Sequence, residues 1–79
     1  MKTGKPMIDA KGRKLKIGDL VLCTEIETKW LGTVIGDTDG LNGNHFLYIR
    51  NSDNECWHKV VGNVEKISNK KAMLWMLEN

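Results

Sequence analysis

The sequence predicts a mainly β fold, a small five-stranded barrel followed by a short C-terminal α-helix. Short segments rich in branched and aromatic residues recur along the chain, and all but one of the connections between them are short. With 79 residues, 41% of them hydrophobic, the chain suits one small folded domain. Consecutive antiparallel hairpins in so small a sheet would expose its edges, and closure into a barrel removes them.

The first two strands are expected on either side of a short polar connection. Residues 15–26 (LKIGDLVLCTEI) are rich in branched side chains, and a bend at Gly18 and Asp19 interrupts them. Gly18 permits the sharp bend, and the Asp19 carboxylate can accept hydrogen bonds from backbone amides there. Residues 30–35 (WLGTVI) follow as the second strand, in which Gly32 marks a bulge or a close backbone approach.

The remaining strands follow the longest predicted loop. Residues 36–44 (GDTDGLNGN) have the composition of a loop that needs positive φ angles. Residues 45–50 and 55–60 predict the third and fourth strands, which the four-residue turn 51–54 joins into a hairpin. A short fifth strand is expected at residues 64–67.

Two further segments flank the barrel, which should span residues 11–67. Residues 1–10 include the only proline and show no apolar periodicity, so they predict a flexible basic arm. In residues 68–79, Ser68 or the asparagine after it can cap a helix that runs through Leu77.

The predicted barrel interior is built from side chains of moderate size. Val21, Cys23, Val34 and Ile67 have the size and placement that such an interior needs. The two cysteines, Cys23 and Cys56, are 33 positions apart, which fits neither a dense disulfide framework nor the paired spacing of a zinc site. We therefore expect both to be buried, reduced and free of metal.

Three patterns together carry a resemblance to known proteins. Residues 9–21 follow D-x-x-G-x-x-L-x-x-G-D-x-V, residues 32–34 follow G-x-V, and residues 64–67 follow V-x-x-I, with Trp57 between the last two. The chain in this respect resembles small uncharacterised bacteriophage proteins, and its Gly-Asp-x-Val opening recurs in SH3-like barrels of the Tudor and KOW kind. The resemblance implies an SH3-like barrel and a phage protein that acts in the host-cell cytoplasm. These positions build the barrel and imply little about activity.

Several classes of function are not expected. No apolar run reaches the roughly 18 residues of a membrane span, and the basic start lacks the apolar core of a signal peptide, which together predict a cytoplasmic protein without membrane contact. Residues 37–40 (DTDG) lack the glycine and glutamate positions of a calcium loop and predict a plain turn. Cys56 and His58, taken with Cys23 or His45, lack the spacing of a structural zinc site and the local signature of a nucleophile. We expect a non-enzymatic protein with no metal and no cofactor.

Positive charge is concentrated at the start of the chain. The first sixteen residues carry six basic side chains and one acidic side chain, a net +5, whereas the remainder carries a net −3. Such a segment is either simply solvated or able to attract phosphate groups, so a nucleic-acid-binding barrel is our alternative functional hypothesis. Its candidate contact residues are Lys11, Arg13, Lys14, Lys16, Arg50 and Lys59.

The last predicted helix should not be stable in isolation. Residues 72–77 (AMLWML) are apolar all round, the helix is short, and Lys70, Lys71 and Glu78 oppose its dipole. It must therefore pack on something. One alternative is an apolar outer face of its own barrel at Leu20 and Leu22. The other is a protein partner or a second copy.

Our leading hypothesis is a non-enzymatic interaction module, a phage accessory protein that binds and modulates a host protein as a monomer or weak homodimer. Methionine-rich surfaces adapt to partners, and exposed aromatic rings can stack on bases or hold a cation. The candidate partner-binding residues are Trp75, Met73, Met76, Trp30 and Trp57.

Overall fold

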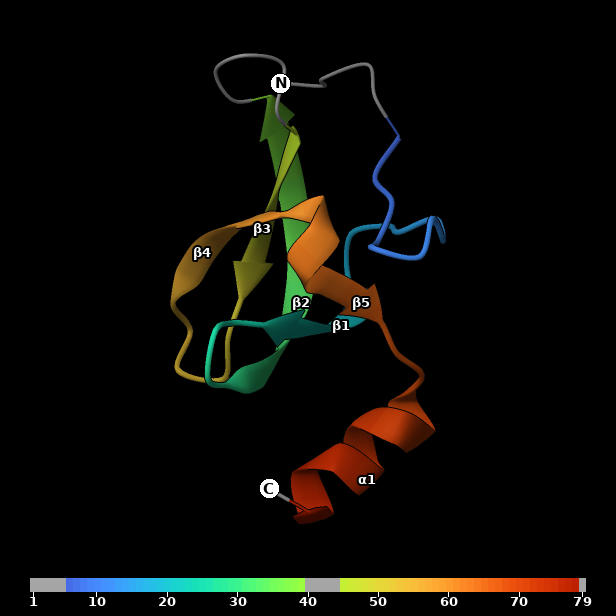
Figure 1. Cartoon of the computed structure of the whole chain (residues 1–79), viewed down its shortest axis with the longest axis vertical. Helices are drawn as coiled ribbons and strands as arrows, with labels where there is room; N and C mark the ends of the chain where they lie inside the picture. Colours follow the sequence, from blue (N-terminus) through green and yellow to red (C-terminus); the bar gives the residue numbers. More distant parts are fainter. Residues whose placement is uncertain (1–5, 40–44, 79) are drawn as a thin grey trace.

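A computed structural model of the chain describes residues 6–39 and 45–78, and these residues form one antiparallel sheet and one α-helix (Figure 1). The order of strands across the sheet is β4-β3-β2-β1-β5. The strands are β1 (Leu20–Thr24), β2 (Lys29–Asp39), β3 (His45–Arg50), β4 (Cys56–Val60) and β5 (Val64–Lys66). A 3-10 turn, η2 (Val61–Asn63), connects β4 to β5, and the helix α1 (Asn69–Glu78) ends the described chain. The predicted mainly β, barrel-like fold with five strands and a C-terminal helix is confirmed.

The bend before β1 forms as predicted, but it makes the first strand shorter than expected. Gly18 has a φ of 97°, and the Asp19 carboxylate accepts a hydrogen bond from the Lys16 amide at 2.9 Å. Because the chain turns there, β1 begins only at Leu20.

Strand β2 is longer than the sequence predicted. It pairs with β3 as far as Asp39, opposite His45, so residues 36–39 are strand rather than loop or plain turn, and residues 40–44 lie outside the described chain. The register shifts between Val34 and Gly36, which identifies a β-bulge at Ile35. Pairing with the apolar strand β3 outweighs the loop-like composition of this segment.

The turn between β3 and β4 is organised by Asn51. Its side-chain oxygen accepts hydrogen bonds from the amides of Asp53 at 3.0 Å and Glu55 at 2.9 Å. Asn54 takes the left-handed conformation, with a φ of 66°, which asparagine tolerates. The predicted four-residue turn is thus confirmed, and it fixes the register that places Trp57 opposite Ile49.

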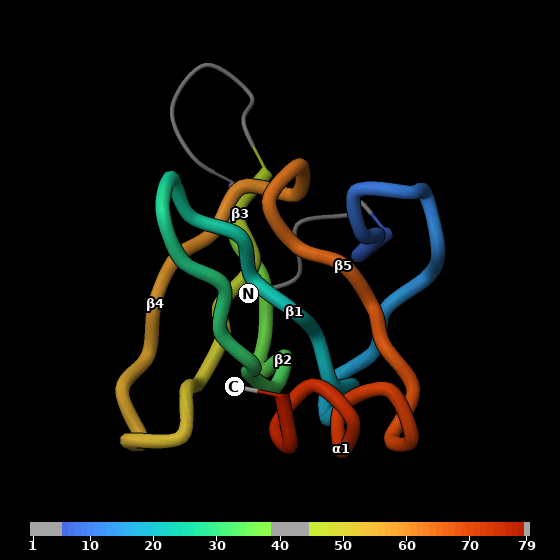
Figure 2. The backbone as a smooth tube through the Cα atoms, turned by 60° about the horizontal axis from the view of Figure 1, so that its bottom comes forward, coloured from blue at the N-terminus to red at the C-terminus, as the bar shows by residue number. Residues whose placement is uncertain are grey.

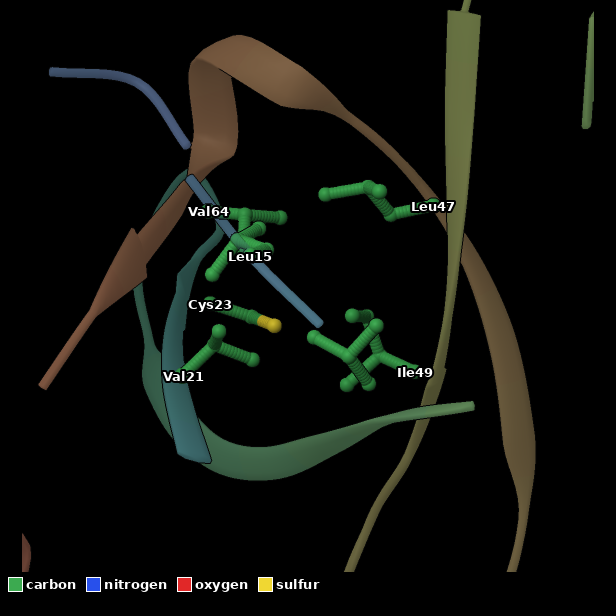
Figure 3. Packing of buried hydrophobic residues seen from close by; sticks show 7 residues of the cluster. Leu15, Val21, Cys23, Leu47, Ile49 and Val64 are labelled. Carbon is green, nitrogen blue, oxygen red and sulfur yellow. The ribbon is translucent and has the colours of Figure 1, made fainter. Parts of the chain in front are cut away.

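The core lies within the curve of the sheet, where side chains from facing strands meet (Figure 3). Val21, Cys23 and Val34 are fully buried, as predicted. Ile67 lies just beyond β5 and is only partly buried, because Val64, opposite Cys23, takes the inward position. The buried cluster consists of Leu15, Val21, Cys23, Val34, Leu47, Ile49 and Val64.

Gly32 allows β2 and β3 to come close together. A Cβ atom at this position would overlap the Ile49 side chain and lie 2.9 Å from the Arg50 carbonyl oxygen. The predicted close backbone approach is confirmed, whereas the bulge in β2 lies elsewhere, at Ile35.

Replacing Gly32 with alanine should therefore lower the free energy of unfolding by about 1–3 kcal/mol, the usual cost of overpacking. Gly36→Ala on the same strand is the matched control, because its Cβ would make only an ordinary contact with Tyr48 at 3.8 Å. Urea denaturation of both variants checks this. Equal stability of the two variants would contradict the close approach at Gly32.

A buried carboxylate attaches the chain before β1 to the outer edge of β5. Asp9 is only 1% exposed. Its Oδ1 accepts hydrogen bonds from the amides of Lys11 at 3.0 Å and Arg13 at 2.8 Å. Its Oδ2 accepts hydrogen bonds from the Lys66 amide at 2.8 Å and from Arg13 Nε at 2.9 Å. The Arg13 guanidinium also donates to the Lys66 carbonyl oxygen at 2.7 Å, and the Ala10 amide donates to that of Val64 at 2.8 Å.

Residues 7–10 therefore belong to the folded domain, and the prediction of a flexible arm through residue 10 is wrong for them. Met7 packs against the core, and Ile8 forms an isolated bridge with Lys14. The sequence suggested an arm because these residues lack apolar periodicity, but a carboxylate and backbone hydrogen bonds supply the attachment. Residues 1–5 lie outside the described chain.

The Asp9 network makes a prediction about pH. Burial alone would raise the pKa of Asp9, but the hydrogen bonds from Lys66, Arg13 and Lys11 lower it below its ordinary value of 3.8. A group with a lowered pKa stabilises the fold fully above its ordinary pKa and loses this effect as the pH falls through the lower, folded-state value. Asp9→Asn should lower the free energy of unfolding by about 3 kcal/mol near neutral pH. The NH2 group that replaces Oδ2 cannot accept from the Lys66 amide or from Arg13 Nε, and each lost acceptor costs about 1–3 kcal/mol.

Urea denaturation of the wild type and Asp9→Asn over a pH series measures this cost. The difference in the free energy of unfolding between the wild type and the variant should stay constant near neutral pH. It should become smaller below the ordinary pKa of 3.8. A difference that widens on acidification would contradict the network.

Helix α1 lies at one end of the barrel, next to β1 and β2 (Figures 1 and 2). The Ser68 hydroxyl accepts a hydrogen bond from the Lys71 amide at 3.1 Å, which confirms the predicted cap. Ala72 is 2% exposed and borders a hollow on the outer face with Leu20 and Leu31. The helix does cover part of the outer face, and Ala72 is the residue that it buries there, whereas Met73 is 62% exposed. The helix has 10 residues, and no helix in the described chain is long and apolar enough to cross a membrane.

Candidate functional site

A groove of about 380 Å³ lies where the two hairpins meet α1. This volume is within the range of small binding sites, about 300–1,000 Å³. We call it the tryptophan groove, because all three tryptophans of the sequence line it. Its lining residues are Glu25, Trp30, Leu31, Asn51, Ser52, Asp53, Trp57, Trp75 and Met76.

Each tryptophan comes from a different element. Trp30 is on β2 opposite Cys23 and packs partly against the core. Trp57 is on β4 opposite Ile49 and is 48% exposed, since β4 is an edge strand. Trp75 is near the C-terminal end of α1 and is partly buried.

Four of the five candidate partner-binding residues therefore meet at one site. Trp30, Trp57, Trp75 and Met76 line the groove, whereas Met73 does not. Met73 and Met76 are three residues apart, yet only Met76 borders the two hairpins. The sequence identified these residues as candidates because they are tryptophans or methionines. The packing of α1 determines which of them lie together.

Trp30 is held in place by a network of charged groups. Its indole N–H donates to Glu25 Oε1 at 2.6 Å, and Glu25 Oε2 lies 3.3 Å from the Lys59 ammonium. The ammonium also lies 5.7 Å from the centre of a Trp30 ring, a cation–π distance. The hydrogen bond from Trp30, followed by the interaction with Lys59, lowers the pKa of Glu25. This wall of the groove is therefore fixed before any partner binds.

Several lining residues were not expected at a site. Glu25 was assigned to the end of the first strand, and residues 51–53 were assigned only to a turn. Leu31 was assigned only to the predicted second strand, residues 30–35. No local signal distinguishes them, because their place in the groove depends on how the two hairpins and α1 come together.

Three of the six candidate nucleic-acid contacts are paired with carboxylates. Lys11 lies 3.4 Å from Glu65, the Arg13 guanidinium lies 2.9 Å from Asp9, and Lys59 is paired with Glu25 as described above. These ion pairs reduce the positive charge available to a phosphate backbone.

The six basic residues also do not share one surface. Arg13 and Lys14 border a hollow beside β5, together with Lys66. Arg50 borders the hollow at Ala72 on the outer face, and Lys59 lies against Trp30. Lys16 is exposed just before β1. The structure therefore separates six residues that the sequence analysis grouped as candidate contacts for nucleic acid.

The two cysteines have different environments. Cys23 is buried, as predicted, and burial raises the pKa of its thiol to about 12. Cys56 is exposed, so the prediction of a buried thiol is wrong there, because it begins the edge strand β4. Elsewhere His45 forms a pair with Asp37 at 2.7 Å. Within residues 6–39 and 45–78, no group of three or more His, Cys, Asp or Glu side chains could hold a metal ion.

Thiol labelling of the native protein should distinguish the two cysteines. A maleimide should label Cys56 rapidly and Cys23 only after unfolding, since a buried thiol with a raised pKa has almost no reactive thiolate. Cys56→Ser should abolish the rapid phase in mass spectrometry. Rapid labelling of that variant would show that Cys23 is accessible.

Comparison with protein-family models, with curated proteins and with solved structures found no match to this chain. Function therefore has to be inferred from the tryptophan groove itself.

Proposed function

We propose that this chain is a protein-binding module and that the tryptophan groove is its contact surface. The observation that carries the proposal is that Trp30, Trp57 and Trp75, from three separate elements, border one groove. Tryptophan is enriched among the residues that dominate binding energy at protein interfaces. Trp57 is 48% exposed, which leaves a large apolar area for a partner to cover.

The construction of the groove supports this role. Trp30 is fixed by Glu25 and Lys59, and Trp57 is positioned by the hairpin turn at Asn51. A surface that is ordered in advance loses little conformational entropy on binding. Met76 contributes a flexible, polarisable side chain that can adapt to the partner's shape.

The partner that we propose is a host protein, which the chain binds and modulates as an accessory factor of a phage. The resemblance of residues 9–21 to bacteriophage proteins is the support for this source. A nucleic-acid-binding role is the weaker alternative, because Lys11, Arg13 and Lys59 are paired with carboxylates.

The test is capture of a partner from a bacterial lysate by the wild type and two variants. Trp57→Ala should raise the dissociation constant of the captured protein about thirtyfold, since truncating a central interface tryptophan costs about 2 kcal/mol or more. Val60→Ala is the matched control, because Val60 is a similarly exposed residue of β4 that does not line the groove. Thermal melting should confirm that both variants stay folded.

Two results would contradict the proposal. One is equal capture by Trp57→Ala and the wild type, which would place the contact surface elsewhere. The other is binding to mixed DNA or RNA that weakens steeply with salt, which would favour the nucleic-acid alternative.

A further inference from the structure

The two edges of the sheet differ in how they are covered. The outer edge of β5 is closed by the segment around Asp9, since Lys66 and Val64 exchange hydrogen bonds with Asp9, Ala10 and Arg13. Strand β4 is the other edge. No residue in the described chain makes a hydrogen bond to its outer side.

The hydrogen-bond pattern shows which residues of β4 face outward. The Asn51 amide donates to the Glu55 carbonyl oxygen at 2.9 Å. Bonded and non-bonded pairs alternate along an antiparallel ladder, so Trp57 and Lys59 bond to β3. The backbone N–H and C=O groups of Cys56, His58 and Val60 therefore point away from the sheet.

Strand β4 also lacks the usual protection of an exposed edge. Natural edge strands carry outward charges, prolines or bulges that prevent pairing. The one charged residue of β4 is Lys59, and its side chain is only 13% exposed because it is turned toward Glu25 and Trp30. The register between β3 and β4 is regular, and Trp57 and Val60 remain 48% and 41% exposed.

We infer that β4 is a dimerisation edge that pairs antiparallel with β4 of a second copy, about a two-fold axis at His58. In this register Cys56 lies opposite Val60 of the second copy, and Trp57 lies opposite Lys59. Both are compatible pairs, and no two lysines or two carboxylates face each other. An antiparallel pair of identical strands is self-complementary, as a two-fold interface requires.

A second copy fits this edge better than an unrelated strand because the strand's own sequence completes each pair. The contact involves only five residues from each copy, so the dimer should be weak and reversible. The paired edge includes Trp57, which also lines the tryptophan groove, but pairing needs neither Trp75 nor Met76. The inference therefore does not depend on the proposed function of the groove.

Disulfide capture tests the register. Val60→Cys in the otherwise native chain should form a covalent dimer with oxidised glutathione, because residue 60 then faces Cys56 of the second copy. The matched control, Val60→Cys with Cys56→Ser, should form no covalent dimer under reducing or oxidising conditions. In that variant the two new cysteines lie about 14 Å apart along the paired strands, too far for a disulfide.

Sedimentation equilibrium provides a second measurement without cysteine chemistry. The wild type should show a concentration-dependent dimer, and His58→Pro should raise its dissociation constant at least about tenfold, because proline removes an outward N–H that an edge strand does not need for folding. Covalent dimers that form equally well without Cys56 would overturn the inference. So would the absence of any covalent dimer together with a monomer at every concentration.

Discussion

The fold depends on the buried carboxylate of Asp9. It accepts hydrogen bonds from the amides of Lys11, Arg13 and Lys66, and so joins residues 9–13 to the last strand of the sheet. Without these bonds, β5 would be a three-residue edge strand with unpaired backbone groups. The arginine beside the carboxylate completes the closure by binding the Lys66 carbonyl oxygen. Two of the six basic side chains in the first sixteen residues, Lys11 and Arg13, are therefore paired with carboxylates within the structure.

Closure of one edge determines what the rest of the molecule presents to solvent. With β5 covered, β4 is the edge of the sheet whose outward backbone groups have no hydrogen-bond partner in the described chain. Trp57 belongs to β4 and also lines the groove, so a well-ordered hairpin turn at Asn51 supports both surfaces. Ala72 is the buried residue in the described part of α1, and Trp75 and Met76 of the same helix lie beside the other tryptophans.

Local patterns predicted the strands and the turn at residues 51–54, because their chemistry acts over a few residues. They did not predict the role of Asp9, whose bond to the Lys66 amide spans 57 positions. Residue type identified the tryptophans as candidates, but their convergence depends on strand register and on helix docking. Cys56 illustrates the same limit, since an apolar strand buries its residues only if it is not at the edge of the sheet.

The most direct test of the functional account is the indole N–H spectrum of the protein during titration with its captured partner. The signals of Trp30, Trp57 and Trp75 should shift together and saturate at one equivalent, because all three line one groove. Backbone signals around Arg13 and Lys14, beside β5, should stay in place. Shifts confined to that basic surface, with the three indole signals unchanged, would contradict the assignment of the groove as the contact surface.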